Sequence, residues 1–205
     1  MGDGRAPAGV DLDTAPPIDD GTLPRIDSPT PGPVGLDARS GSPSPSIADQ
    51  IVGYARRQRG SHVGDGQCFA LVDRALRGAH AKSAADYGTI TPDADYEWGT
   101  SVSLTDLRPG DVIQFRDYTF KRVVVTDTGS STVTEELEGG RPHHSAVVES
   151  VDGNGAVTVL EQNAPEGSAV TRTTLYFTAG TTTSGNRTTT ITVNGTFRFF
   201  RPEAR

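Results

Sequence analysis

The chain has 205 residues, enough for one domain of ordinary size together with some unstructured sequence, and 34% of them are hydrophobic. A net charge of −7, with only two lysines, disfavours binding to the phosphates of nucleic acids or to an anionic membrane surface. No stretch approaches the roughly 18 consecutive apolar residues that a transmembrane helix needs.

Residues 1–45 are predicted to form an unfolded tail. They contain nine of the 14 prolines and seven of the 24 glycines, with seven aspartates against three arginines. Such a composition buries too little apolar surface to offset the chain entropy that folding removes. The tail is expected to be a solubilising leader or a contact site for a protein partner. Residues 46–205 are predicted to form the folded domain.

The start of the sequence and its cysteine content bear on cellular location. The chain begins Met-Gly-Asp-Gly-Arg, without the cationic and apolar regions of a secretory signal. A cytoplasmic protein, or one exported by a non-classical route, is therefore expected. The single cysteine, Cys68, excludes an intrachain disulfide and is compatible with a reducing compartment.

Two amphipathic helices are predicted at the start of the domain. Ser46 is a good N-cap, apolar residues follow it at helical spacing, and Gly60 is the expected end of the first helix. After a turn that ends at Gly66, a second helix is predicted to begin at Cys68 and to end near Gly78.

The rest of the chain is predicted to be mainly β-structure. Runs rich in Val, Thr and Phe between turn residues predict strands over 112–115, 119–126, 131–137, 144–151, 156–162, 169–178, 187–193 and 195–201. Two helices followed by such strands predict an α+β domain. In this domain the N-terminal helices are expected to pack on an antiparallel β-sheet, with an extra C-terminal β-hairpin.

Cys68 is the first candidate for chemistry. A helix N-terminus presents unpaired N–H groups and the positive end of the helix dipole, and both favour a thiolate over a thiol. Gly66 and Gln67 come directly before the cysteine and are expected to contact substrate, while the N–H of Cys68 is suited to bind a developing oxyanion. The competing interpretation is a buried small hydrophobic residue, which free cysteines commonly are.

His144 is the predicted base for this cysteine. It opens a strand in which alternate residues share its face, so its imidazole is expected to point from the sheet edge toward Cys68 and to form a thiolate–imidazolium pair. His143 lies on the opposite face by the period of two, although a bulge at Pro142 would exchange the two histidines.

Two residues at the end of the next strand are candidates to orient the histidine. Glu161 and Asn163 share one face, and a tight hairpin brings their strand end beside that of His144. A carboxylate or an amide next to the second ring nitrogen fixes its tautomer and orientation. Glu161 is the first choice and Asn163 the second.

Trp98 is the third expected substrate-binding residue, against the alternative that it belongs to the core. The loop that contains it also carries Asp93, Asp95 and Glu97, which lack the EF-hand calcium pattern. No metal site and no cofactor are predicted.

Four blocks of sequence carry a family resemblance. They are Gly-Gln-Cys at 66–68, Pro-Gly-Asp-Val at 109–112, His-Ser-Ala-Val-Val-Glu at 144–149 and Val-Thr-Val-Leu-Glu-Gln-Asn at 157–163. Their order resembles the CHAP family (cysteine, histidine-dependent amidohydrolase/peptidase) within the NlpC/P60 papain-like group. The resemblance implies a papain-like fold and catalytic roles for Cys68, His144 and the Glu161 or Asn163 position. It also implies peptidoglycan peptide as the leading substrate.

A second branch is similar as well. Residues 91–99 and 160–167 resemble the cysteine-proteinase-fold domain at the C-terminus of certain fungal actin-patch proteins. The chain departs from the CHAP pattern through a long insertion at 116–142 and a Thr-rich extension at 164–205. The sequence thus predicts a thiol amidohydrolase or peptidase. The alternatives are an intracellular peptidase or deconjugase, and a non-catalytic papain-fold interaction module.

Overall fold

The structure is a computed structural model that describes residues 44–153 and 155–205. The predicted tail, residues 1–45, lies almost wholly outside these residues. Two α-helices open the described part: α1 spans Ile47–Arg57 and α2 spans Cys68–Gly78. The N-terminus of α1 is closed by a capping box, in which Ser46 and Asp49 satisfy each other's backbone N–H groups.

Seven strands form one antiparallel sheet. They are β1 (Thr100–Val102), β2 (Val112–Asp127), β3 (Thr132–Val151), β4 (Ala156–Glu161), β5 (Thr171–Tyr176), β6 (Gly180–Ser184) and β7 (Arg187–Arg201). The strand order is β1-β7-β2-β3-β4-β5, and β6 pairs with the outer part of β7. Two single-turn 3-10 helices, Ala84–Asp86 and Leu104–Asp106, lie in the connections.

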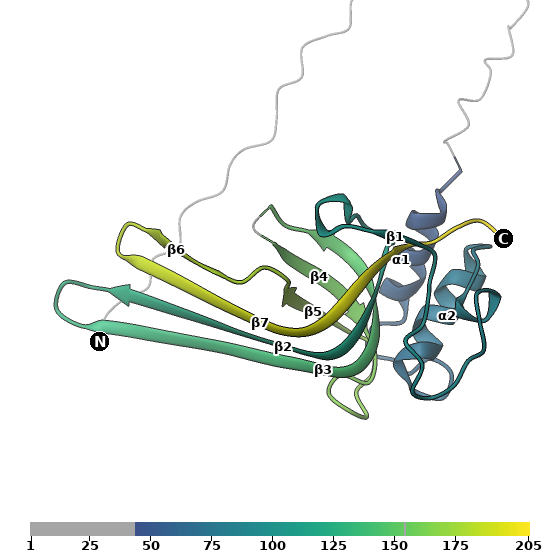
Figure 1. Cartoon of the computed structure of the whole chain (residues 1–205), viewed down its shortest axis with the longest axis horizontal. Coiled ribbons are helices and arrows are strands. Elements are labelled where there is room, and N and C mark those ends of the chain that lie inside the picture. Colours follow the sequence, from purple (N-terminus) through teal and green to yellow (C-terminus); the bar gives the residue numbers. More distant parts are fainter. Residues whose placement is uncertain (1–43, 154) are drawn as a thin grey trace, which may run out of the picture. The chain divides into compact units, whose positions relative to one another are not determined.

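The long strands extend beyond the rest of the sheet (Figure 1). We call this extension the arm and define it as residues 119–127 of β2, 132–140 of β3, all of β6, and 187–194 of β7. The body is the remainder of the described residues, with both helices at the opposite end of the sheet. The strands predicted over 119–126 and 131–137 are confirmed, because β2 and β3 form a hairpin that pairs from Val112↔Val147 to Asp127↔Thr132.

A bulge lies where the body meets the arm. The β2–β7 register shifts between Arg116 and Thr119, and Asp117 has a positive φ of 52°. Opposite it, Gly195 has a φ of 83°, and a Cβ built there would lie 2.1 Å from the carbonyl oxygen of Asp117. Only glycine allows the two backbones to approach so closely.

The body holds two core clusters, one on each side of the sheet. The first joins the apolar faces of α1 and α2 to sheet residues such as Val112 and Val147. The second contains their neighbours in sequence, including Ile113 and Ala146, with an array of aromatic rings. Successive strand residues therefore enter opposite clusters, as the period of two requires.

The predicted α+β class, with a layer of N-terminal helices packed on a sheet, is wrong. The described residues are mostly antiparallel strand, and their only α-helices are two of 11 residues each. The prediction described 116–142 as an insertion into the family pattern and divided 187–201 into two strands. In the structure these segments extend one continuous sheet, and the β6–β7 hairpin belongs to it.

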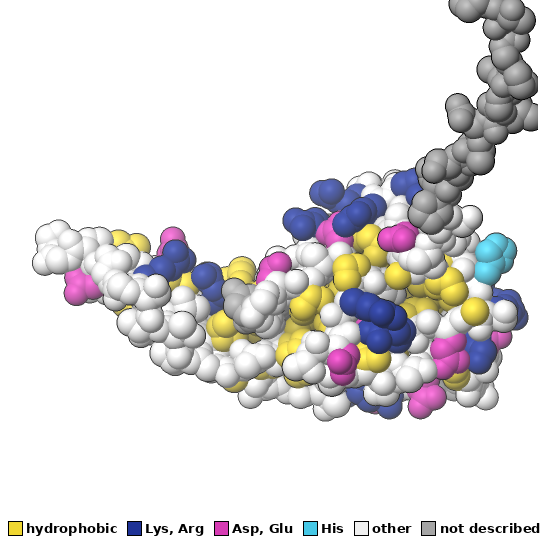
Figure 2. Space-filling model, turned by 90° about the horizontal axis from the view of Figure 1, so that it is seen from above, with side chains coloured by type: hydrophobic (Ala, Val, Ile, Leu, Met, Phe, Trp, Pro, Cys, Tyr) yellow, Lys and Arg dark blue, Asp and Glu magenta, His cyan; other side chains and the backbone are white. Residues whose placement is uncertain are grey.

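The surface carries charges of both signs. On the face shown in Figure 2, basic and acidic side chains are interspersed over the body, with apolar side chains between them. Among the described helices, none is long and apolar enough to cross a membrane.

Candidate active site

Cys68 is the first residue of α2, as predicted, and its side chain is partly buried. As the first helical residue it has no acceptor for its N–H within the helix. The turn before it is held by local bonds: Gln67 N–H donates to Asp65 Oδ1 (3.0 Å), and Gly66 N–H donates to the carbonyl oxygen of Val63 (3.1 Å). Gly66 has a φ of 86°, a conformation that favours glycine.

Gln162 ties this turn to the end of β4. Its fully buried side chain accepts from Val63 N–H (2.6 Å) and donates to the carbonyl oxygens of Val63 (3.0 Å) and Gln67 (2.9 Å). The residue before the cysteine is therefore fixed relative to the strand that follows the histidine. This buried bridge links the start of α2 to the end of β4 through three hydrogen bonds.

His144 lies on β3 opposite Phe115 and is almost completely buried. Burial disfavours the imidazolium, but hydrogen bonding and charge interactions with Cys68 and Glu161 outweigh it and raise the pKa of His144. Burial likewise disfavours the thiolate, yet the hydrogen bond and positive charge of His144, assisted by backbone groups of Ser145 and Phe69, lower the pKa of Cys68. Both shifts act in the direction that favours a thiolate–imidazolium pair.

Glu161 lies behind the histidine on β4 with no exposed surface. Its Oε2 atom lies 3.1 Å from His144 Nε2, within reach of an ion pair with the imidazolium. Arg141 forms two parallel bonds to the carboxylate, from Nε to Oε2 (2.7 Å) and from Nη2 to Oε1 (2.5 Å). Burial opposes ionisation of Glu161, but its bonds with His144 and Arg141 lower its pKa to about 2.

Asn163, the alternative orienting residue, has different partners. Its Nδ2 donates to Gln67 Oε1 (3.0 Å), and its Oδ1 accepts from Gly167 N–H (2.6 Å). It adopts a left-handed conformation with φ of 65°. Of the two predicted candidates, Glu161 is the one that contacts the imidazole, whereas Asn163 braces the turn at Gln67.

A groove of about 750 Å³ opens over the cysteine and the histidine. One part of its lining comes from residues 90–92 and Tyr96, and another from residues 163–166. Residues 140–145 of β3 form a further part. Gln67 lines it too, whereas Gly66 lines a smaller neighbouring hollow of about 370 Å³. Cys68 and His144 therefore both line one groove, whose walls carry apolar and polar side chains.

Trp98 lies in the core and does not line the groove, so the expectation that it contacts substrate is corrected. The indole is fully buried, and its Nε1–H donates to Gln114 Oε1 (3.1 Å). Its ring packs against Phe69 (5.3 Å between centroids) and Tyr96 (5.7 Å), two residues that do line the groove. Trp98 thus supports the groove from below.

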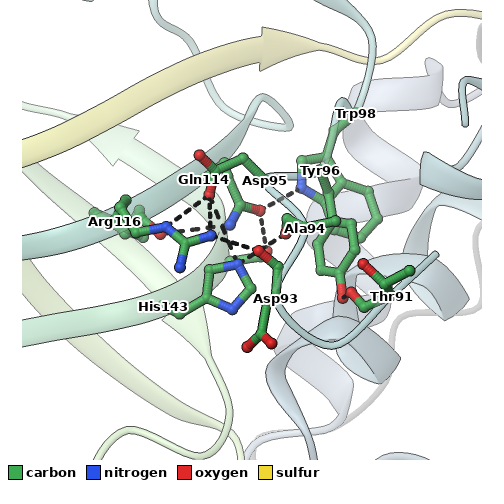
Figure 3. A network of polar contacts seen from close by, with 11 residues as sticks. Thr91, Asp93, Ala94, Asp95, Tyr96, Trp98, Gln114, Arg116 and His143 are labelled. Atoms are coloured by element: carbon green, nitrogen blue, oxygen red, sulfur yellow. Dashed lines mark hydrogen bonds and ion pairs between the residues drawn. The ribbon is translucent and has the colours of Figure 1, made fainter. Parts of the chain in front are cut away.

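The loop that forms one groove wall is fastened to β2 and β3 (Figure 3). Arg116 donates to Asp95 Oδ1 from Nε (3.0 Å) and from Nη2 (2.7 Å). Nη2 of Arg116 also donates to the carbonyl oxygen of Asp93 (2.7 Å). Nε2 of His143 lies 2.8 Å from the carbonyl oxygen of Ala94. The carboxylate of Asp95 therefore anchors this loop to β2, and His143 holds it to β3.

Sequence reasoning missed three functional residues. Arg141, Gln162 and Gln114 are buried polar residues that hold the site together, and Gln114 accepts from both Trp98 and Ser145 (2.7 Å for Ser145 Oγ). One signal was available for Arg141, since a carboxylate expected inside the domain needs a cationic partner. Across the described residues, no group of three or more His, Cys, Asp or Glu side chains is arranged to hold a metal ion.

A cysteine at a helix start, a histidine on the adjoining strand and a sheet of this topology define a papain-like cysteine-proteinase fold. The family model of the AIM3/BBC1 cysteine proteinase-fold domain matches residues 42–179. The chain belongs to this family, which agrees with the second of the two resemblances found in the sequence. The finer assignment to CHAP or NlpC/P60 stays a prediction.

The chain was also compared with curated protein sequences and with solved structures. No curated protein sequence matches the chain. A solved structure described as "The crystal structure of Ly7917" is similar at 20% sequence identity with a TM-score of 0.39. The similarity covers 63% of this chain and 56% of that one, so the match spans little more than half the length of that protein.

Proposed function

We propose that the protein is a cysteine amidohydrolase or peptidase in which Cys68 is the nucleophile and His144 the base. The observation that carries the proposal is the placement of Cys68 and His144 together in one open groove, with Glu161 3.1 Å from the second side of the imidazole. The interaction between the two side chains lowers the pKa of Cys68 and raises that of His144, in keeping with this placement. In a buried structural cysteine without a charged partner, burial raises the pKa of the thiol. The pKa of Cys68 is lowered instead. Glu161, held by Arg141, orients the imidazole from behind.

The reaction proceeds in two halves. The Cys68 thiolate attacks the carbonyl carbon of the amide and forms a C–S bond, and the N–H of Cys68 is positioned to stabilise the oxyanion. The His144 imidazolium then gives its proton to the departing amine nitrogen as the C–N bond breaks. In the second half His144 takes a proton from water, the hydroxide attacks the thioester, and the C–S bond breaks to release a carboxylic acid.

The substrate class follows from the same groove. Apolar side chains such as Ile90 and Phe69 share its lining with the exposed carboxylates Asp65 and Glu166. Those carboxylates favour a peptide that carries amino or cationic groups. Both a polypeptide and the peptide part of peptidoglycan meet that description, so both belong in the substrate test.

Labelling by an irreversible thiol-reactive peptide probe tests the nucleophile. The wild-type chain is expected to react at Cys68 far faster than a free thiol, and His144→Ala should slow the reaction strongly, since it removes the group that favours the thiolate. His143→Ala is the matched control, because it removes the adjacent histidine. An undiminished rate in His144→Ala would overturn the proposal.

Mass spectrometry of digests tests the substrate. Purified muropeptides and a set of lysine-containing polypeptides are incubated with the wild-type chain and with Cys68→Ser. New fragments that depend on Cys68 identify the cleaved bond. If neither substrate class is cleaved although the probe labels Cys68, then the groove binds peptides without hydrolysing them.

A further inference from the structure

The arm leaves one long strand edge unpaired. Strand β3 pairs with β2 along its length, but β4 covers only Val147–Val151 of its other side. In the described residues no strand pairs with residues 132–140 on that side, and all of them except Gly139 are exposed. Figure 1 shows β3 as the outermost strand of the arm on the side away from β6. Half of the backbone N–H and C=O groups of such an edge point outward and are free to bind another strand.

The side chains of this edge differ between its two faces. Val133 and Leu137 are exposed by 49% and 47%, which places them among the large exposed apolar residues of the described chain. Glu136 and Glu138 alternate with Leu137 and therefore lie on the opposite face. Lys121 pairs with Glu136 (2.7 Å), whereas no ion pair involves Glu138 within the described residues. One face of the edge thus carries Val133 and Leu137, with Glu135 between them in an ion pair to Arg187 (3.6 Å). The other face carries Glu136 and Glu138 and is acidic.

The edge leads directly into the groove. Residues 132–140 are continuous along β3 with residues 140–145, which line the cleft above Cys68 and His144. A segment that adds to the edge of β3 and continues along it would therefore run toward the proposed nucleophile.

Two other occupants fit this edge poorly. In a second copy of the chain paired antiparallel about its centre, Glu136 would face Glu136 of the other copy, and like charges opposite each other are destabilising. Residues 1–45 of the chain contain seven aspartates and three arginines, so they also share the sign of the edge. Charge complementarity instead selects an external segment with basic side chains.

We infer that the edge of β3 over residues 132–140 binds an extended segment of a polypeptide substrate by strand addition. The segment alternates basic residues, which face Glu136 and Glu138, with apolar or β-branched residues, which face Leu137 and Val133. The inference rests on the proposed function only for the fate of the bound segment, since strand addition itself needs no hydrolysis. It names the substrate as a polypeptide with an extended basic region.

Fluorescence anisotropy with the Cys68→Ser chain tests binding without turnover. The probe is a fluorescein-labelled peptide of about ten residues that alternates lysine with threonine or valine. Two further peptides carry N-methyl groups on every second backbone nitrogen, one at odd and one at even positions. In an extended peptide, the odd and the even N–H groups point to opposite edges, and only one edge can pair with β3. Methylation of the set that faces β3 should therefore weaken binding at least tenfold, and methylation of the other set by less than about twofold.

Charge variants supply the second arm of the test. Glu138→Lys is expected to weaken binding of the lysine peptide about fivefold, because an attractive cross-strand pair becomes repulsive. Glu97→Lys, which changes an exposed carboxylate outside the edge, should leave the dissociation constant within about twofold. Equal effects of the two methylated peptides, or an unchanged affinity in Glu138→Lys, would overturn the inference.

The two proposals fail separately. Peptide binding at the edge without any cleavage by the wild-type chain would refute the hydrolase and leave the docking edge standing. Cleavage of short peptides, with a KM for the long peptide that Glu138→Lys does not change, would refute the docking edge alone.

Discussion

The body and the arm belong to one sheet, but they use polar residues in opposite ways. In the body, groups such as Glu161 and Gln162 have no exposed surface and each has several partners. In the arm, threonines such as Thr181 and Thr183 lie on an exposed strand and pair with threonines across it, at 3.2 and 3.1 Å between hydroxyl oxygens. Desolvation makes each buried contact decisive for stability, whereas water can replace each contact in the arm.

The largest effect is expected when the base of the body site is removed. His144→Ala should lower kcat/KM about 10³-fold, because general acid–base catalysis contributes 10²- to 10⁴-fold. The ultraviolet absorbance of the thiolate near neutral pH should fall in the same variant, since the pKa of Cys68 returns toward its ordinary value. A variant that retains both activity and thiolate would show that the two side chains are not coupled.

Removal of Arg141 should produce the next largest effect. In Arg141→Met the Glu161 carboxylate stays buried without its bidentate partner, so the free energy of unfolding should fall by about 3–5 kcal/mol. Urea denaturation of the whole chain measures this loss. The double variant Arg141→Met with Glu161→Gln should recover much of it, because the buried charge is gone. If the double variant is no more stable than Arg141→Met, the charge pair is not the cause.

The pH dependence of stability sharpens the same contrast. The pKa of Glu161 is lowered from 4.5 to about 2 in the folded chain. Its ionised form therefore stabilises the fold above about pH 4.5, and this contribution, about 3 kcal/mol, is lost as the pH falls toward 2. The difference in unfolding free energy between wild type and Glu161→Gln should shrink over that interval. A constant difference would contradict the lowered pKa.

The smallest effect is expected in the arm. Thr183→Ala removes a hydroxyl that pairs with Thr188 on an exposed face, so the free energy of unfolding should change by less than about 0.5 kcal/mol. Thermal unfolding monitored by circular dichroism provides the measurement. A loss above about 1 kcal/mol would mean that the arm is as tightly coupled as the body.

The candidate site residues were proposed from local signals in the sequence, whereas the extent of the sheet depends on contacts between distant segments. The glycine-rich turn before Cys68 and the hairpin between His144 and Glu161 are short-range features, and the structure brings these residues together. The pairing of Arg141 with Glu161 is not marked by any turn residue, and only the need of a buried carboxylate for a cationic partner points to it. The burial of Trp98 follows from the packing of its loop, in which the indole contacts the rings of Phe69 and Tyr96, and no local signal decides this.

The length of the sheet was misjudged for a different reason. Turn-forming residues stand inside both long strands, at Asp117 in β2 and at Gly139 and Gly140 in β3, where local propensity disfavours a continuous strand. The structure accommodates Asp117 in the bulge and places Gly139 where a Cβ would lie 2.8 Å from the Phe120 ring. Tertiary contacts therefore gave these residues a place within strands that local propensity disfavours.

The bulge at Asp117 and Gly195 also limits which changes in arm length evolution can accept. Tyr118, which follows Asp117, is buried in the body, so the site keeps its geometry as long as this junction is kept. Beyond the junction, the arm can lengthen or shorten by two residues in each strand without reversing which side chains share a face. A change of one residue would exchange the faces of every position up to the tip. Relatives of this chain should therefore differ in arm length by even steps and retain a glycine at position 195.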